Sequence, residues 1–340
     1  MRRWEILQGD VRETLRALPE KTVQTCVTSP PYFGLRDYGV EGQIGLEPTP
    51  AEYVEQMVQV FREVRRVLRD DGTLWLNLGD SYAANRAYQV PSTKGGPKHS
   101  DSQSAGGKGS VVPDGLKPKD LVGIPWRVAF ALQADGWYLR QDIIWHKPNP
   151  MPESVRDRCT KAHEYVFLLS KSERYYWDAE AMQEPAVATD IGAMDGGAQR
   201  LPNGANANDG RNFRSKRDSF KRENSKRAQA IPGQVVGTHR AQREESGYDT
   251  FTRNKRSVWT VATRPYKGAH FATFPPALIE PCILAGAPFD GLVLDPFTGS
   301  GTTAAVALQH GRRFIGCELN PDYIKLAEAR IAAAEAEVLW

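Results

Sequence analysis

The chain has 340 residues, of which 40% are hydrophobic and 25% are charged, and its formal net charge at pH 7 is +3. This composition is ordinary for a folded protein and excludes fibrous and wholly disordered classes. No apolar run approaches the roughly 18 residues of a membrane span, and the four cysteines lack the paired spacing of a zinc site or a disulfide framework. We therefore expect a soluble, intracellular protein without a membrane partner or a metal site.

Short apolar runs alternate along the chain with stretches of helical periodicity, which is typical of βα units around a mostly parallel sheet. Seven strands are expected, at residues 4–8, 23–28, 73–78, 138–146, 164–169, 292–294 and 313–317. Six helices are expected, at residues 11–18, 51–68, 121–135, 276–285, 301–309 and 321–334. The second helix is predicted to end at the turn Asp70-Asp71-Gly72.

Two segments of low complexity interrupt this pattern. Residues 86–120 hold almost no large apolar side chain, so they bury too little surface to offset the entropy lost on ordering and are predicted to form a mobile loop. Residues 185–256 are similar, and within them Arg211–Arg227 holds eight Lys or Arg against two Asp or Glu. Two interpretations remain open for this stretch: a solvated insert, or a basic arm that binds a polyanion.

An apolar strand, a turn of small residues and a helix follow one another in residues 292–303, with Asp295 at the end of the strand. Glycines in such a turn let a ligand approach the backbone closely, and the acid can accept hydrogen bonds from a cationic amine. Glu318 ends the next strand, where a carboxylate binds ribose hydroxyls in nucleoside-binding α/β sheets. The two acids in register favour a nucleoside-containing ligand over a plain structural turn.

Two consecutive prolines follow the strand at residues 23–28, in the sequence Ser29-Pro30-Pro31-Tyr32. Prolines stiffen the backbone and lack an N–H group, so the carbonyls there are acceptors with a fixed direction. The Ser29 hydroxyl and the Pro30 carbonyl are then able to accept both hydrogens of an exocyclic NH2 group, while the Tyr32 ring stacks on a planar base. A rigid turn after a strand is the structural alternative.

Ser29-Pro30-Pro31-Tyr32 resembles the catalytic motif of the amino-methyltransferases that modify cytosine N4 or adenine N6 in DNA, and Asp295–Gly301 resembles their S-adenosylmethionine motif. The N-terminal catalytic motif and C-terminal cofactor motif are similar in order to the β group of these enzymes. The resemblance implies an α/β, Rossmann-like, seven-stranded methyltransferase fold that is circularly permuted and carries basic low-complexity inserts.

The resemblance also implies a division of the chain. Residues 1–182 are expected to be the catalytic part of the methyltransferase domain, with the mobile loop at about 86–120, and residues 258–340 its cofactor-binding part. Residues 183–257 are expected to be a variable basic insert for DNA target recognition. The matching segments are residues 1–85, 120–182 and 258–335.

Roles for single residues follow from the resemblance. It assigns the methionine end of the cofactor to Asp295, Pro296, Phe297, Thr298, Gly299, Ser300 and Gly301. Glu318 would bind the ribose and Asp10 the adenine edge, while Phe274 and Pro275 would close over the cofactor. The catalytic residues would be Ser29, Pro30, Pro31 and Tyr32.

The implied chemistry is a direct transfer to a base that has flipped out of double-stranded DNA and stacks on Tyr32. Adenine-N6 members of the family usually have Asp at the Ser29 position, whereas cytosine-N4 members usually have Ser, so cytosine N4 is the favoured target and adenine N6 the alternative. A protein or small-molecule N-methyltransferase is a more distant alternative, as is a catalytically idle DNA-binding module.

Double-stranded DNA is the macromolecular partner that the resemblance implies. Its expected contacts are Arg36, Lys147, Arg211, Arg214, Lys216, Arg217, Lys221 and Arg222. Residues 33–39 are expected to be either a wall of the base pocket or a plain surface loop, and Asp80 is expected to line the site. A second copy of the chain, in a homodimer, and a cognate restriction endonuclease are further candidate partners. The expected location is the cytoplasm, and the gene is expected to be bacterial, archaeal or phage-encoded.

Overall fold

The computed structural model describes residues 3–83, 112, 115–186, 252–263 and 274–338. The chain divides into two compact units, one made of Met1–Gln183 with Asn254–Trp340 and the other of Glu184–Arg253. Most of the loop predicted at 86–120 and all of the basic stretch Arg211–Arg227 lie outside the described residues. Within the described ranges, no helix is long and apolar enough to cross a membrane.

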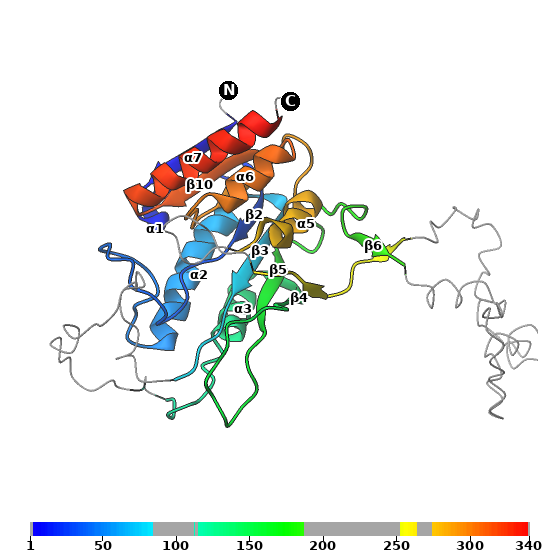
Figure 1. Cartoon of the computed structure of the whole chain (residues 1–340). Helices are drawn as coiled ribbons and strands as arrows, with labels where there is room; N and C mark the ends of the chain where they lie inside the picture. The colour runs from blue at the N-terminus through cyan, green and yellow to red at the C-terminus, as the bar shows by residue number, and fades with distance from the viewer. Residues whose placement is uncertain (1–2, 84–111, 113–114, 187–251, 264–273, 339–340) are drawn as a thin grey trace, which may run out of the picture. The chain divides into compact units, whose positions relative to one another are not determined.

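The first unit contains an eight-stranded sheet with the strand order β1-β10-β9-β2-β3-β5-β4-β8 (Figure 1). The strands are β1 (Trp4–Gln8), β2 (Val23–Thr28), β3 (Leu68–Leu78), β4 (Tyr138–His146), β5 (His163–Ser170), β8 (Val258–Thr260), β9 (Leu292–Asp295) and β10 (Arg313–Glu318). All pairs are parallel except those that β5 makes with β3 and β4. The seven expected strands are all present, and the short strand β8 is an eighth at the edge.

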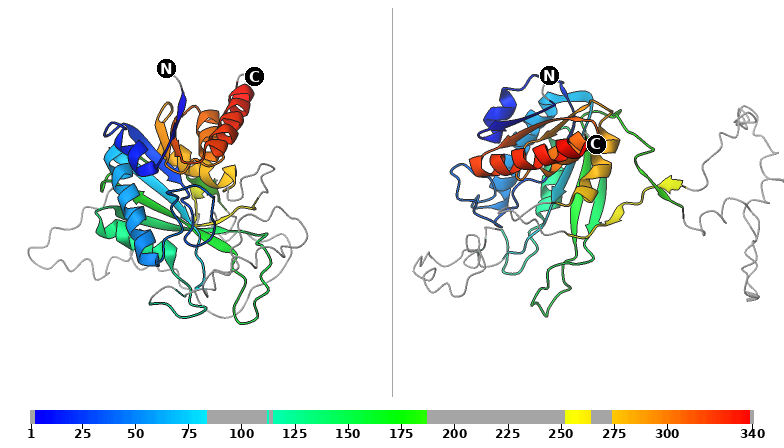
Figure 2. Two further views of the ribbon diagram at one scale, coloured as in Figure 1. Left: turned by 90° about the vertical axis from the view of Figure 1, so that its left-hand side faces the viewer. Right: turned by 45° about the horizontal axis from the view of Figure 1, so that its top comes forward.

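Helices cover both faces of this sheet (Figures 1 and 2). On one face lie α1 (Val11–Arg16), α2 (Pro50–Val67) and α3 (Ile124–Ala134). On the other lie α5 (Pro276–Gly286), α6 (Thr302–Gln309) and α7 (Pro321–Val338). Each set of helices buries its own apolar cluster against the sheet, and this layered packing confirms the expected α/β class.

Helix α2 begins where its sequence predicts a helix start. Thr49 and Glu52 form a reciprocal capping box, and Pro50 occupies the first turn, where its missing N–H costs nothing. The apolar side chains spaced three and four residues apart face the core, and they include Tyr53, Met57, Val60, Phe61 and Val64. Burial of this face anchors the helix beside β2 and β3.

The end of α2 differs from the expectation. The helix stops at Val67, and Leu68 is already extended and pairs with Val23 of β2. The prediction of a turn at Asp70-Asp71-Gly72 is wrong, because these residues belong to β3 and their carbonyls bind neighbouring segments. The N–H of Lys171 donates to the Gly72 carbonyl and that of Tyr176 to the Asp71 carbonyl, so tertiary hydrogen bonds override the local turn propensity.

Strands from the two ends of the chain lie side by side in the sheet. β10 pairs with β1 on one side and β9 on the other, and β9 also pairs with β2. Because these four strands are parallel, their carboxyl ends meet at one edge, which is where ligands bind in open α/β sheets. The topology therefore brings the segments after β1, β2, β9 and β10 together.

A separate two-stranded sheet pairs β6 (Gln183–Pro185) with β7 (Thr252–Asn254). Arg253 and Glu184 form an ion pair across it at 2.9 Å. Neither strand was expected, since three residues are too few to show an alternating pattern.

Candidate active site

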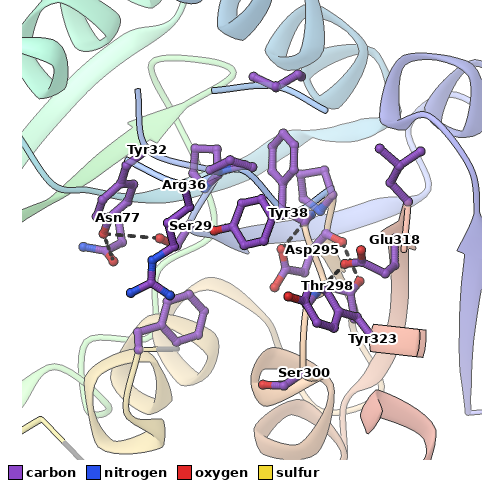
Figure 3. Close-up of a pocket in the computed structure, with 18 of the residues that line it drawn as sticks. Ser29, Tyr32, Arg36, Tyr38, Asn77, Asp295, Thr298, Ser300, Glu318 and Tyr323 are labelled. Carbon is purple, nitrogen blue, oxygen red and sulfur yellow. Dashed lines mark hydrogen bonds between the residues drawn. The ribbon is translucent and has the colours of Figure 1, made fainter. Parts of the chain in front are cut away.

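A cavity of about 620 Å³ lies at the carboxyl ends of β1, β2, β9 and β10. Figure 3 shows Ser29 and Tyr32 toward one side of it and Asp295 and Glu318 toward the other, with Tyr38 between them. We call the two sides the motif end, formed by Ser29–Tyr32, and the acidic end, formed by Asp10, Asp295 and Glu318. The structure thus brings the two predicted motifs, from opposite parts of the chain, into one cavity.

Asp295 at the end of β9 is only 2% exposed. Its Oδ1 accepts the Thr28 hydroxyl at 2.7 Å and the Phe297 N–H at 3.0 Å, and its Oδ2 accepts the Thr303 hydroxyl at 2.6 Å. Burial raises the pKa of Asp295 to about 6, although these hydrogen bonds oppose the rise. A carboxylate oxygen has two lone pairs, so Oδ2 keeps capacity for a ligand amine.

Glu318 at the end of β10 ties this strand to the turn after β9. Its Oε2 accepts the Gly299 N–H at 2.7 Å, and its Oε1 accepts the Asn320 N–H at 2.9 Å. Gly299 has φ of 53°, in the left-handed region that glycine adopts without a steric penalty. Burial raises the pKa of the Glu318 carboxyl as well.

Asp10 follows β1 and caps α1, accepting the N–H of Arg12 at 2.7 Å. The Arg12 guanidinium also binds both carboxylate oxygens, and these hydrogen bonds lower the pKa of Asp10. The N–H of Gly9 donates to the Glu318 carbonyl at 3.0 Å, which holds Asp10 beside the acidic end. Asp10 lines the cavity with its charge already paired.

Most of the other predicted cofactor residues line the cavity, and two lie in the packed structure around it. The cavity is lined by Phe274, Pro296, Phe297, Thr298, Gly299 and Ser300. Gly301 lies outside the lining: it starts α6 with φ of 76°, and a Cβ there would come within 2.9 Å of Ala327 on α7. Pro275 also lies outside, buried where α5 begins.

All four predicted catalytic residues, Ser29, Pro30, Pro31 and Tyr32, line the motif end. The Tyr53 hydroxyl from α2 donates to the Pro31 carbonyl at 2.9 Å, which fixes the turn against the helix. The Pro30 carbonyl accepts no hydrogen bond from the described part of the chain. One carbonyl of the pair is therefore used for structure, and the other remains an acceptor.

The Tyr32 hydroxyl is held by two residues that sequence analysis did not select. It lies 3.1 Å from Asn77 Oδ1 and 2.7 Å from Glu164 Oε2, and Asn77 Nδ2 donates to the same Glu164 oxygen at 3.4 Å. The ring packs closely on Gly79, where a Cβ would lie 2.4 Å from a ring carbon. Burial raises the pKa of the Tyr32 phenol well above its ordinary value, so the phenol stays protonated.

Lys147 and Arg36, the two described residues predicted to contact DNA, line the cavity. The Lys147 ammonium forms an ion pair with Glu164 and lies 4.3 Å from the centre of the Trp145 ring. Arg36 belongs to residues 33–39, which form a wall of the cavity through Leu35, Arg36 and Tyr38. The other predicted contacts lie outside the described residues: Arg211, Arg214, Lys216, Arg217, Lys221 and Arg222.

Asp80 does not line the cavity, contrary to expectation. Its Oδ1 accepts the N–H groups of Gly123 at 2.9 Å and Ile124 at 3.1 Å, where α3 begins. A carboxylate at a strand end is equally suited to capping a neighbouring helix, and here it satisfies amides that have no partner within that helix.

Residues 23–329 match the family model described as DNA methylase. The chain belongs to the DNA methylase family. It is 44% identical to the type II methyltransferase M.XycI of Xanthomonas campestris pv. cyanopsidis, over 98% of this chain and 89% of that protein. It is 43% identical to M.SmaI of Serratia marcescens, over 97% and 91% of the two chains.

Solved structures agree with this methyltransferase in fold. The cytosine-N4-specific PvuII DNA methyltransferase aligns with a TM-score of 0.58 at 18% identity, over 99% of this chain and 92% of that one. A DNA modification methylase of Thermus thermophilus, solved with S-adenosylmethionine, aligns with a TM-score of 0.55 at 22% identity, over 97% and 93%. Both solved proteins therefore have the same fold as this chain.

Family membership makes the chain an S-adenosylmethionine-dependent DNA methyltransferase of the class that modifies cytosine N4 or adenine N6. The acidic end fits that cofactor, because buried Asp295 and half-buried Glu318 are carboxylates that form no ion pair among the described residues. Such groups suit an ammonium and a ribose diol. S-adenosylmethionine, when bound, supplies a methyl group on a sulfonium centre.

We expect the affinity for S-adenosylmethionine to fall as the pH drops below about 6. The resemblance predicts that the cofactor's ammonium binds ionised Asp295, and burial raises the pKa of this carboxyl to about 6 in the free protein. Below that pH, binding must first remove a proton, so affinity is expected to decrease up to about tenfold per pH unit. Calorimetric titration at pH 7.5 and pH 5 measures this change. Equal dissociation constants at the two pH values would contradict it.

Proposed function

We propose that this methyltransferase modifies the N4 amine of cytosine at a specific sequence in double-stranded DNA, as the protective partner of a restriction endonuclease. The observation that carries the proposal is the position of Ser29, a neutral hydroxyl, at the motif end of the cavity that also holds the acidic end. The type II names of its relatives support the restriction-modification role. A homodimer and a cytoplasmic location stay predictions from the resemblance.

The motif end supplies two acceptors for one amine. Ser29 and Pro30 both line the cavity, and the Pro30 carbonyl accepts no hydrogen bond from the described residues. If each accepts one N–H of the target, the nitrogen lone pair is drawn out of conjugation with the ring and becomes nucleophilic. Orientation then contributes the remainder of the rate enhancement, because the amine and the methyl group of the cofactor are held in line for the transfer.

A base inside a duplex cannot reach this cavity, so the target nucleotide has to flip out of the stack. Tyr32 is suited to receive it, since its hydroxyl is fixed by Asn77 and Glu164 and its ring rests on Gly79. An aromatic ring that is already immobilised loses little entropy when a base stacks on it.

Expression in a methylation-free host tests the proposal. Sequencing that distinguishes the two products is expected to find N4-methylcytosine at one recurring site. N6-methyladenine instead would overturn the choice of base and leave the family assignment standing. A genome with neither modification would contradict the proposed function.

The basic stretch Arg211–Arg227 yields a prediction about DNA binding. If it contacts phosphates, its deletion should weaken binding and flatten the salt dependence, reducing the log–log slope by about 0.9 for each phosphate that is no longer bound. Fluorescence anisotropy over a range of salt concentrations measures the slope. A deletion variant with the parental slope would make the stretch a passive linker.

A further inference from the structure

Methyl transfer to an exocyclic amine releases a proton that the site must accept. The NH2 group becomes NHCH3, and the sulfonium becomes a neutral thioether, so one positive charge leaves as H⁺. Ser29 is a neutral hydroxyl and cannot hold that proton itself. A stronger base has to lie within reach of Ser29.

Among the described residues, four carboxylates line the cavity: Asp10, Glu164, Asp295 and Glu318. Three of them form the acidic end, where Arg12 pairs with Asp10 and buried hydroxyl or N–H groups bind the others. Glu164, in β5, is the one carboxylate of the four that is hydrogen-bonded to the catalytic motif. It is therefore the candidate acceptor.

The hydroxyl groups between Ser29 and Glu164 are aligned as donors in one direction. Ser29 Oγ donates toward the Tyr32 hydroxyl at 3.5 Å, and the Tyr32 hydroxyl donates to Glu164 Oε2 at 2.7 Å. The first distance is long for a hydroxyl pair, but catalytic hydrogen bonds often tighten only when the substrate is bound. A chain of hydroxyl groups thus leads from Ser29 through Tyr32 to Glu164.

Lys147 holds the end of this path in place. Its ammonium pairs with Glu164 Oε1, which leaves Oε2 directed at Tyr32, and it packs over the Trp145 ring. The side chains of Lys147 and Glu164 are only 18% and 16% exposed. Asn77 adds a second donor to Oε2 at 3.4 Å, so the carboxylate has a fixed orientation.

We propose that Glu164 accepts the proton of the methylated amine through the hydroxyls of Ser29 and Tyr32; the inference rests on the proposed function. As the N–C bond forms and the C–S bond breaks, the amine proton passes to Ser29 Oγ. The Ser29 hydroxyl proton passes to Tyr32, and the Tyr32 proton passes to Glu164 Oε2. Both hydroxyls are restored, and the products are the N-methylated base, the thioether and protonated Glu164.

Glu164→Gln tests the relay, because glutamine keeps the shape of the side chain and an acceptor oxygen for Tyr32 but is not basic. Single-turnover methyl transfer is measured with labelled S-adenosylmethionine and genomic DNA from a methylation-free host. The rate is expected to fall about 100-fold, at the lower limit for general base catalysis. Cofactor affinity should stay close to that of the wild type. The melting temperature should fall, because Lys147 loses its ion-pair partner, so rates are compared well below the melting temperatures of both proteins.

Tyr32→Phe provides a second variant, since it keeps the aromatic ring and interrupts the same path. It should lose about as much rate as Glu164→Gln, and the double variant should be no slower than the slower single variant, because residues that act as a unit are not additive. The rate of the wild type should also fall in D2O, and this isotope effect should shrink in Glu164→Gln. Glu173→Gln, which alters an exposed carboxylate, is the matched control.

A Glu164→Gln rate within about threefold of the wild type would overturn the relay, as would multiplicative losses in the double variant. Methylation of DNA by the wild-type protein tests the proposed function separately from the relay. If it transfers no methyl group to DNA, the proposed function fails, whereas a wild type that makes N6-methyladenine leaves the relay to be judged on the same rate ratios.

Discussion

Replacing Asp295 by alanine is expected to weaken S-adenosylmethionine binding about 10- to 100-fold. A hydrogen bond to a charged group contributes about 1.5–3 kcal/mol, and each 1.4 kcal/mol is a factor of about ten in the dissociation constant. The substitution also leaves the Thr28 and Thr303 hydroxyls and the Phe297 N–H without their acceptor. Isothermal titration calorimetry measures the affinity.

Two further variants separate the ligand contact from the local structure. Thr303→Val removes the hydroxyl that binds Oδ2 but keeps the carboxylate, so it should cost far less affinity than the loss of Asp295. Asp142→Ala, which changes an exposed acid on β4, should bind the cofactor as the parent does. Unchanged affinity in Asp295→Ala would remove this residue from the site.

Tyr32→Ala is expected to reduce DNA methylation by roughly one to two orders of magnitude beyond the loss in Tyr32→Phe, because it removes the stacking ring as well as the hydroxyl. Stacking of a single base on an aromatic side chain is worth about 1–3 kcal/mol, and about 1.4 kcal/mol of barrier corresponds to a tenfold change in rate. Cofactor affinity should persist, because Tyr32 lies at the motif end, whereas the predicted cofactor residues Asp295 and Glu318 lie at the acidic end (Figure 3).

The ring of Tyr32 packs against the core cluster under α1, α2 and α3, so its truncation also lowers stability. Methylation rates are therefore compared at a temperature well below the melting temperatures of the wild type and of Tyr32→Ala. Tyr138→Ala, at a tyrosine that is 46% exposed at the start of β4, controls for the loss of a ring as such. Full activity in Tyr32→Ala would mean that the motif is a structural turn.

Local sequence patterns were sufficient to predict most of the sheet. Each of the seven expected strands is present within a few residues of its expected bounds. Strands β3, β5, β9 and β10 contain buried apolar runs, whereas β1 and β4 are partly exposed. Asp70-Asp71-Gly72 shows the limit of this approach, since a turn-like sequence forms part of β3 once Lys171 and Tyr176 bind its carbonyls. Short β8 carries too few residues for any pattern.

In the site, motif residues were predictable and their partners were not. Asp295 and Glu318 each end a strand and Ser29 follows one, so the topology alone places them at one edge. Asn77 and Glu164 become neighbours only through the antiparallel pairing of β3 with β5, in which Asn77 lies opposite Val166. A single glutamate within a strand belongs to no sequence motif, so nothing in the sequence indicates that it contacts Asn77 or Tyr32.

Motif membership also did not reveal what each residue contacts. Gly301 belongs to the cofactor motif, yet its position is explained by the close approach of α7, since a Cβ would meet Ala327 at 2.9 Å. Lys147 is predicted to contact a DNA phosphate, and the sequence did not reveal that its ammonium pairs with Glu164 inside the cavity. Side-chain partners of this kind depend on tertiary packing, which composition and periodicity do not encode.

During synthesis, β1 and β2 leave the ribosome long before β9 and β10, the strands that lie between them in the sheet. At about 5–20 residues per second, the wait is on the order of tens of seconds. Throughout that time β1 has no neighbour to pair with, and a chain that stops short of β9 lacks Asp295 and Glu318. We therefore expect nascent and truncated chains to lack the predicted cofactor residues, so that methylation begins only when β10 has emerged and entered the sheet.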